Sequence, residues 1–393
     1  MSKWTPAYLD EMNQKMDPIA DKVVASILAG GIGEEMQVNE LFRKLIRTSD
    51  PIPTGLPPEV AQYFEDTAAL PAWADPKLIR KGELLFGEHG PMIVLILFCR
   101  CLPFGYACHR VAKVMAATGR LQEKPPGTDR LAMLNRRILE TAQFILNVMQ
   151  PGGLADRGMG VRTTQKIRLI HASIRYFLEE QGWDSKKFGA PLNQEYLAGV
   201  ILTFSLVTID GLKTVGVNLT NDEKLAYLHA WNVVGHIIGV DEGLIAHTVA
   251  DAEELFWTIF DRQKGPSQDG TDLTHSLINY MNSKFPVDFL NAIPPFMITR
   301  LCGKKIAEML QVDTHGNIFL RLMLVAMRFV GELTEKLDQE SRLFRNVTSF
   351  LSHAFLQELV KIYNDEKQIY FYIPPSLRND WGMPAAPSAP PKK

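Results

Sequence analysis

Hydrophobic residues recur every three or four positions along most of the chain, which is the period of an amphipathic α-helix. Amphipathic helices fill most of residues 6–46. Further helices are predicted over residues 76–86, 91–102, 104–118, 129–149, 163–181, 193–215, 221–238, 242–263, 270–283, 286–310, 316–334 and 341–362. Only Gln368–Ile373 alternates as a strand does, and one strand cannot form a sheet. The pattern therefore predicts an all-α fold.

Helix-start signals and proline-rich stretches divide the chain. Thr220 and Glu223 have the spacing of a capping box ahead of an apolar run. A proline-rich stretch at 51–58 follows the first helices, and the last residues are rich in Pro and Ala. The expected parts are an N-terminal helical extension with a Pro-rich arm (1–75), a main helical domain (76–373) and a disordered tail (374–393).

Composition excludes some classes of protein. The chain has 393 residues, 46% hydrophobic and 22% charged, as soluble globular proteins do. A formal net charge of −2 without a Lys/Arg-rich run predicts no nucleic-acid partner. The first residues lack the apolar core of a secretory signal, and the most apolar stretch, 91–103, is too short to cross a bilayer. We therefore expect a cytoplasmic protein without a transmembrane segment, although a trimmed secretory signal would leave the same sequence. No pattern indicates the oligomeric state.

Motifs of the common metal and phosphate sites are absent. The chain has no His-Glu-x-x-His, no glycine-rich phosphate loop and no Gly-x-Ser-x-Gly. His229 and His236 are seven residues apart, a poor interval for chelation, and are interpreted as core or boundary histidines. Four cysteines are too few and too badly spaced for a disulfide framework or a four-cysteine zinc site; they are Cys99, Cys101, Cys108 and Cys302.

One histidine stands on a predicted apolar helix face. Ile167 lies four residues before His171, and Ile174 and Leu178 lie three and seven after it, so all share one side of the helix. An imidazole in such a place must bond a polar partner or coordinate something. A lone histidine on an apolar face is most often a satisfied core residue. Both interpretations stay open on spacing alone.

A polar cluster recurs on another predicted helix. Arg137, Glu140 and Thr141 occupy positions i, i+3 and i+4 and face one way. The cluster is either an ion pair on a solvated face or, because an apolar stripe follows it, a group at the core boundary. Thr203 is an isolated hydroxyl in an apolar helix, where it usually bonds the carbonyl one turn earlier. An apolar-face histidine opposite a polar cluster is the arrangement that a haem pocket needs.

Five short segments, in order, resemble the latex clearing protein (rubber oxygenase) family and its mycophenolic-acid-type oxygenase relatives. The segments are Arg137–Thr141, Ile167–Arg175, Pro191–Gln194, Thr203–Ser205 and Ala226–Trp231. Their order and spacing hold from about residue 78 to about residue 373. Each segment alone is weak, but five in order over most of the chain are specific.

The resemblance implies a globin-like helical haem-binding core with additional helices, and a b-type haem with its iron. His171 matches the proximal iron ligand of the family, Arg137 and Thr141 match polar residues of the haem-binding helix, and Thr203 matches a threonine of the pocket. In the rubber-cleaving members, both atoms of O₂ are inserted across an isoprenoid carbon–carbon double bond, giving aldehyde and ketone ends.

The chain departs from the rubber-cleaving members at two positions. Glu140 stands where they carry a lysine, and Phe104 stands where they carry a glutamate proposed as the base. Glu140 is therefore the candidate base here, with Arg137 and Thr141 acting beside it.

The expected function is O₂-dependent oxidation or C=C cleavage of a small hydrophobic, unsaturated and isoprenoid-like substrate by a cytoplasmic b-haem oxygenase. Two alternatives stay open. One is a haem protein with a peroxidase-like or gas-sensing role. The other is a haem-free helical interaction module, in which His171 is a core histidine and the Arg137 cluster a surface ion pair.

Overall fold

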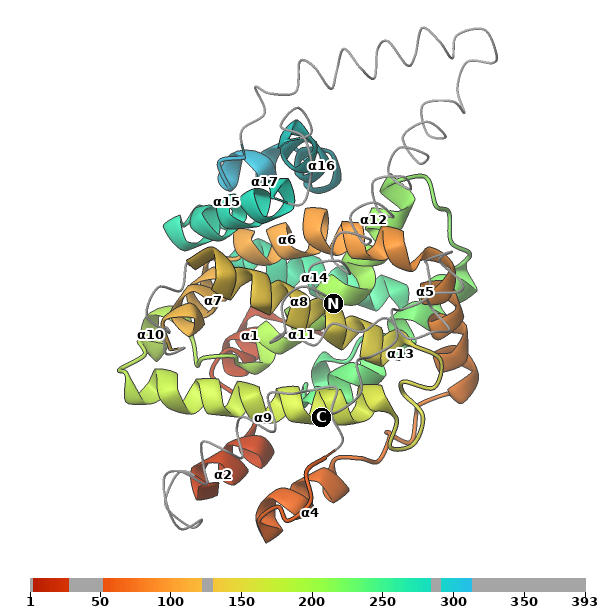
Figure 1. Cartoon of the computed structure of the whole chain (residues 1–393), viewed down its shortest axis with the longest axis vertical. Coiled ribbons are helices and arrows are strands. Elements are labelled where there is room, and N and C mark those ends of the chain that lie inside the picture. The colour runs from red at the N-terminus through yellow and green to blue at the C-terminus, as the bar shows by residue number, and fades with distance from the viewer. Residues whose placement is uncertain (1–2, 28–51, 122–129, 284–290, 313–393) are drawn as a thin grey trace, which may run out of the picture.

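The computed structural model describes residues 3–27, 52–121, 130–283 and 291–312 (Figure 1). Within these ranges every named element is a helix, and β-pairing is limited to an isolated bridge between Cys108 and Lys264. The all-α prediction is confirmed. The strand-like Gln368–Ile373, the tail 374–393 and the helices predicted over 316–334 and 341–362 lie outside the described residues.

The described residues form a series of α-helices. They are α1 (Pro6–Met12), α2 (Pro18–Ser26), α4 (Pro58–Asp66), α5 (Pro76–Ile96), α6 (Leu102–Ala107), α7 (His109–Leu121), α8 (Arg130–Met149), α9 (Met159–Glu180), α10 (Ser185–Phe188), α11 (Gln194–Leu202), α12 (Thr208–Thr214), α13 (Asn221–Ile238), α14 (Val249–Gln263), α15 (Gln268–Asn282), α16 (Ile293–Cys302) and α17 (Lys304–Met309). Two π-helices, η2 (Leu97–Cys101) and η3 (Thr203–Val207), continue α5 and α11, and a short 3₁₀ turn, η4 (Glu242–Leu244), precedes α14.

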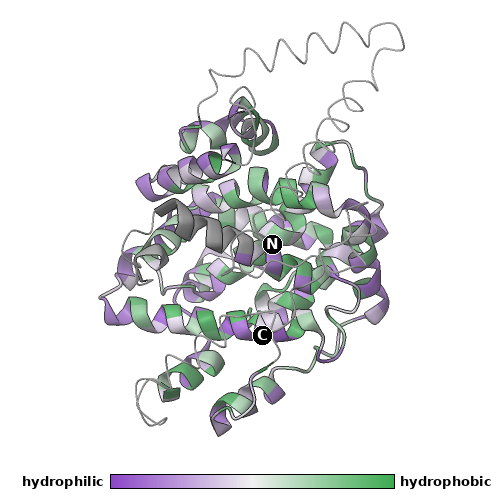
Figure 2. Ribbon diagram, in the orientation of Figure 1, coloured by the Kyte–Doolittle hydropathy of each residue, from purple (hydrophilic) through white to green (hydrophobic). Residues whose placement is uncertain are grey.

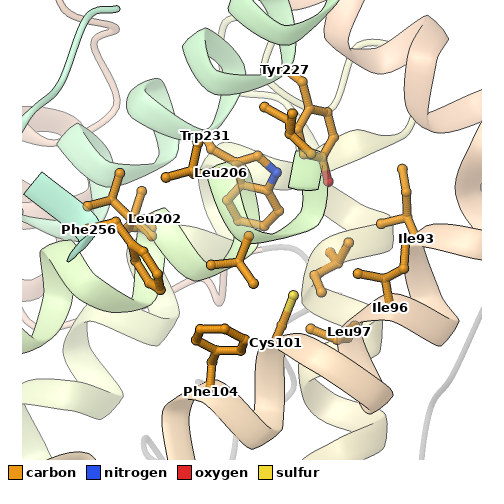
Figure 3. Close-up of a cluster of buried hydrophobic side chains, with 14 of the residues drawn as sticks. Ile93, Ile96, Leu97, Cys101, Phe104, Leu202, Leu206, Tyr227, Trp231 and Phe256 are labelled. Carbon is orange, nitrogen blue, oxygen red and sulfur yellow. The ribbon is translucent and has the colours of Figure 1, made fainter. Parts of the chain in front are cut away.

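A core of aromatic and aliphatic side chains joins α5, α6, α11, α13 and α14 (Figure 3). Trp231 and Tyr227 of α13 are fully buried there, and Phe204 stacks on Trp231 with ring centroids 5.0 Å apart. Gly82 lets α5 approach α13, because a Cβ at that position would lie 3.0 Å from the carbonyl oxygen of Ala226. The close crossing of α5 and α13 is therefore the centre of the bundle.

Two helix predictions differ from the structure in a way that bears on the site. The separate helices predicted over 76–86 and 91–102 form one helix, since α5 continues through Pro91 and into η2. The helix predicted over 193–215 is interrupted by η3. A π-turn displaces carbonyls from the α-helical register, and side chains of η2 donate to two carbonyls of η3. Cys101 Sγ donates to the Thr203 carbonyl (3.3 Å) and Arg100 Nε to the Val207 carbonyl (3.2 Å).

Two apolar helical stretches are long enough to cross a bilayer by length and composition. They are Pro76–Ala107, whose most apolar window is 89% buried in the protein, and Gln194–Thr214, whose window is 61% buried. The expectation that 91–103 is too short therefore missed the continuation of α5 and η2 into α6. Burial inside the bundle is what core helices of globular proteins show, and two such helices are weak grounds for a membrane span.

The N-terminal helices close one face of α9. Figure 1 shows α2 and α4 on one side of α9 and the bundle on the other. Arg168 makes a two-pronged contact with Asp17, with Nε–Oδ2 at 2.6 Å and Nη2–Oδ1 at 2.8 Å, and both side chains are almost fully buried. Arg175 Nε lies 2.6 Å from Asp21 Oδ1. These pairs, with an apolar contact of α2 on Leu169, fix α2 against α9.

Candidate functional site

A tight turn joins α8 to α9 and folds them into an antiparallel pair. Gly153 is required in the turn, because a Cβ there would lie 2.3 Å from the carbonyl oxygen of Val148. A row of buried amides then links the helices. Gln143 Nε2 donates to Asn147 Oδ1 (2.8 Å), and Asn147 Nδ2 donates to Thr163 Oγ1 (3.1 Å). This row sets the register of α8 against α9.

This register places the predicted residues of α8 and α9 at the same height along the axes of the two helices. Glu140 precedes Asn147 by seven residues and His171 follows Thr163 by eight, so at about 1.5 Å rise per residue their heights differ by about one residue. Glu140, Thr141 and His171 are all half-buried, and His171 Nδ1 is inaccessible to solvent. Arg137 belongs to α8 as predicted, but its side chain lies outside the described part of the chain.

Several apolar side chains of the bundle helices are only partly covered. Seven such side chains, here called the apolar set, come from α7, α9, α11 and η3: Met115, Ala117, Ile167, Ile174, Tyr196, Val200 and Phe204. Ile174 packs with Tyr196 and Ala117 around a small cluster of fully buried residues. Since Ile167 and Ile174 share the side of α9 that carries His171, the imidazole belongs to this half-covered surface.

Thr203 stands where the apolar set meets a small cavity. Its Oγ1 donates to the Gly199 carbonyl at 2.7 Å, the bond expected of a hydroxyl in an apolar helix. The cavity has a volume of about 30 Å³, and its lining includes Thr203, Tyr196 and the aromatic side chains of Phe104, Phe256 and Phe260. Phe104 thus contributes an aromatic wall at the position where the sequence departs from the rubber-cleaving pattern.

One carboxylate in the cavity lining was missed by the sequence interpretation. Glu195 is fully buried, with Oε2 accepting from Asn13 Nδ2 (2.9 Å) and Oε1 from Arg262 Nε (3.1 Å). Its position in the first turn of α11, after the N-cap Asn193, is a visible signal of a helix start only. Its two partners come from distant parts of the chain, so the sequence could not show that this glutamate is buried and paired.

The remaining histidines of α13 have other partners, and no clustered metal site accompanies them. His229 Nε2 accepts from the backbone N–H of Asp75 (2.8 Å), and burial lowers the pKa of its imidazole. His236 Nδ1 pairs with Glu242. Over the described residues, no group of three or more His, Cys, Asp or Glu side chains is arranged to hold a metal ion. The four cysteines are buried free thiols, and burial raises the pKa of Cys101 to about 11.

The side chains around His171 fit a haem in their chemistry. A haem iron needs an axial imidazole, apolar contacts for the ring faces and polar groups near the bound gas or the propionates. His171, the apolar set, and Glu140 with Thr141 supply these three kinds of group from α7, α8, α9 and α11. The cavity beside Thr203 is far smaller than a porphyrin, so the macrocycle would lie against the apolar set rather than inside that cavity.

The fold and the site define a class of protein: an all-helical bundle that sets one half-buried imidazole among partly covered apolar helix faces. The chain belongs to the family described as "ER-bound oxygenase mpaB/B'/Rubber oxygenase, catalytic domain", whose model matches residues 110–388. The resemblance drawn from the five sequence segments is confirmed.

Two similar proteins are consistent with this family. The rubber oxygenase of Streptomyces sp. (strain K30) is 25% identical over 268 residues, which is 67% of this chain. The match spans 62% of the length of that relative. Among solved structures, latex clearing protein in the closed state aligns with a TM-score of 0.72 at 20% identity, covering 92% of this chain and 94% of the other. At that identity the likeness shows the fold.

Proposed function

We propose that the protein is a b-haem oxygenase that uses O₂ to oxidise a hydrophobic unsaturated molecule, or to cleave it at a C=C bond. Membership of an oxygenase family supports the class of reaction. The observation that carries the proposal is the half-buried His171 on the partly covered side of α9 that carries Ile167 and Ile174, at the same height along the helix pair as Glu140 and Thr141 of α8. When bound, the haem would supply the activation of O₂.

The residues of this chain would divide the remaining tasks. His171 would hold the iron, and the apolar set would cover the ring faces and exclude water. Arg137 would pair with a propionate, and Thr141 would orient polar groups beside it. Glu140 would accept an allylic proton from the substrate or, when protonated, donate a hydrogen bond to O₂. The aromatic wall formed by Phe104, Phe256 and Phe260 supports a hydrophobic substrate over a polar one.

A UV–visible spectrum of the purified protein tests the cofactor first. We expect a Soret band that shifts on reduction with dithionite and shifts again with CO, because His171 is the single proposed iron ligand and reduced haem would bind CO. Absence of a Soret band after expression with added haem would instead favour a haem-free interaction module.

The variant Glu140→Gln tests the proposed base. It keeps size and hydrogen-bonding capacity but cannot accept a proton at neutral pH. We expect haem content to stay at the wild-type level while turnover of an unsaturated apolar substrate falls by about 10²-fold or more. Unchanged turnover would remove Glu140 from the mechanism. Product labelling under ¹⁸O₂ separates oxygenation from peroxidase-like or gas-sensing chemistry, because only an oxygenase transfers the label to product.

A further inference from the structure

A second cavity, of about 500 Å³, lies outside the site described above. Its walls come from the proline-rich arm at residues 52–56, from α4 and from the start of α9. Arg162, which lines it, is nine residues before His171 on α9, so the two side chains leave the helix on opposite sides. Figure 2 shows hydrophilic and hydrophobic residues alternating along α9, as expected of a helix with two different faces.

The cavity has an apolar wall. Phe64 of α4 is almost fully buried, and Leu56 of the arm packs with it against α2 and α9. Pro53, whose ring restricts the backbone, and the exposed Ala61 of α4 complete this side. A volume of 500 Å³ lies in the range of pockets that take drug-sized molecules. The size and lining suit a chain of methylene groups.

The lining of the cavity also carries charged side chains. Arg157 and Glu65 pair across the rim, with Nη2 and Oε2 2.7 Å apart, so their charges balance. Arg162 Nη1 donates to the Arg157 carbonyl (2.8 Å), whereas its buried Nε meets no acceptor within the described chain. The amide of Gln165 is already used by the Phe64 carbonyl and Thr67. The lining therefore carries a net charge of +1, located at Arg162.

We propose that this cavity binds a medium-chain carboxylate, with the carboxylate on Arg162 and the alkyl chain along Phe64 and the arm. A carboxylate forms strong charge-assisted bonds with a guanidinium, and Arg162 is the cation of the lining that no lining carboxylate balances. A single negative charge matches the net charge of the lining. The apolar wall favours an amphiphile over a small inorganic anion, since only the amphiphile covers Phe64 and Leu56.

Calorimetric titration of the full chain with dodecanoate, below its micelle concentration, tests the proposal. We expect saturable binding at one site, and none with dodecyltrimethylammonium, which has the same tail and the opposite charge. Arg162→Gln should weaken dodecanoate binding about tenfold or more through loss of the charged bond. Arg80→Gln removes an exposed arginine of α5 outside the lining and should leave the affinity unchanged.

A second variant keeps the test decisive if Arg162→Gln proves unstable. Ala61→Phe places an aromatic ring at an exposed position of α4 that lines the cavity, where it fills space without disturbing buried residues. It should also lower the dodecanoate affinity. Wild-type affinity in Ala61→Phe, or equal binding of the cationic amphiphile, would overturn the proposal. A lower affinity in Ala61→Phe, with Arg80→Gln unaffected, supports it, whatever the haem content of the protein.

Discussion

Two histidines on bundle helices, His229 on α13 and His171 on α9, show how a structural histidine differs from a candidate ligand. His229 is 8% exposed, and its Nε2 accepts the N–H of Asp75, the N-cap of α5. The edge of Trp73 meets its ring with centroids 5.6 Å apart. Because Nε2 is an acceptor, the neutral ring fits its surroundings, and burial lowers the pKa. These two contacts of His229 hold the segment before α5 against α13.

His171 lies on a surface that the protein covers only in part. Its neighbours on the same side of α9, Ile167 and Ile174, remain half-buried. On its other flank, Arg168 and Arg175, three residues before and four after His171, pair with Asp17 and Asp21. The burial of His229 and its bond to the Asp75 backbone are explained by folding. An imidazole among partly covered apolar residues leaves surface that a bound molecule can cover, and this difference directs the proposed haem to His171.

The largest expected effect is on haem content. His171→Ala should abolish haem retention, because it removes the proposed iron ligand, whereas His229→Ala should keep the Soret band in the folded protein. Haem per folded chain is measured by pyridine haemochrome assay beside circular dichroism. Full haem occupancy in His171→Ala would show that His171 is not the iron ligand and that the two histidines do not differ in this respect.

Substitutions in the part of α9 that pairs with Asp17 and Asp21 should change the free energy of unfolding instead. Arg168→Met leaves the buried Asp17 without its main partner and should lower the free energy of unfolding by about 3–5 kcal/mol. The exposed pair of Arg157 and Glu65 is the matched control. Arg157→Met breaks this pair and should lower the free energy of unfolding by about 1 kcal/mol or less. Urea denaturation measures both. Equal losses in the two variants would mean that burial does not distinguish the pairs.

Several features could be predicted from the sequence because they are local. The capping box of Thr220 and Glu223 is present at the start of α13, and Gly239 ends that helix with φ +92°. The helical spacing placed His171 with Ile167 and Ile174 on one face, and the Thr203 hydroxyl makes the expected bond one turn back. Each of these depends on residues within one or two helical turns, which periodicity and capping rules describe.

Other features depend on contacts between distant residues. Pro91 usually ends a helix, yet α5 passes through it, because Pro91 is buried in the bundle and packing outweighs the lost hydrogen bond. Two carbonyls of η3 accept from donors of η2, Val207 from Arg100 and Thr203 from Cys101, which are more than a hundred residues away in the sequence. Spacing alone could not show that Ile167 and Ile174 stay half-buried, since coverage depends on how α7, α8, α9 and α11 approach one another.

Truncation of the structural histidine should have a moderate effect. His229→Ala removes the acceptor of the part-buried Asp75 N–H. It should lower the free energy of unfolding by about 1–3 kcal/mol. His247 also meets Trp73, at 4.9 Å between centroids, but is exposed. His247→Ala should therefore change stability by about 0.5 kcal/mol or less. If His247→Ala proves the more damaging change, the Trp73 contact rather than the Asp75 bond holds this segment.

The smallest expected effect is a pH dependence that belongs to His229 alone. Its folded pKa is lowered from 6.5, chiefly by burial, so the unfolded chain binds the proton more readily and stability rises with pH in this window. The contribution is fully present above about pH 6.5 and is lost as the pH falls through the lowered pKa.

His229→Gln keeps an acceptor for Asp75 but does not titrate, so its urea midpoint should vary less over this range. Groups such as His236 and Glu242 are present in both proteins, and their common background cancels in the difference. Parallel pH profiles would mean that His229 titrates alike in the folded and unfolded chains, and the bond to Asp75 would then not require the neutral ring.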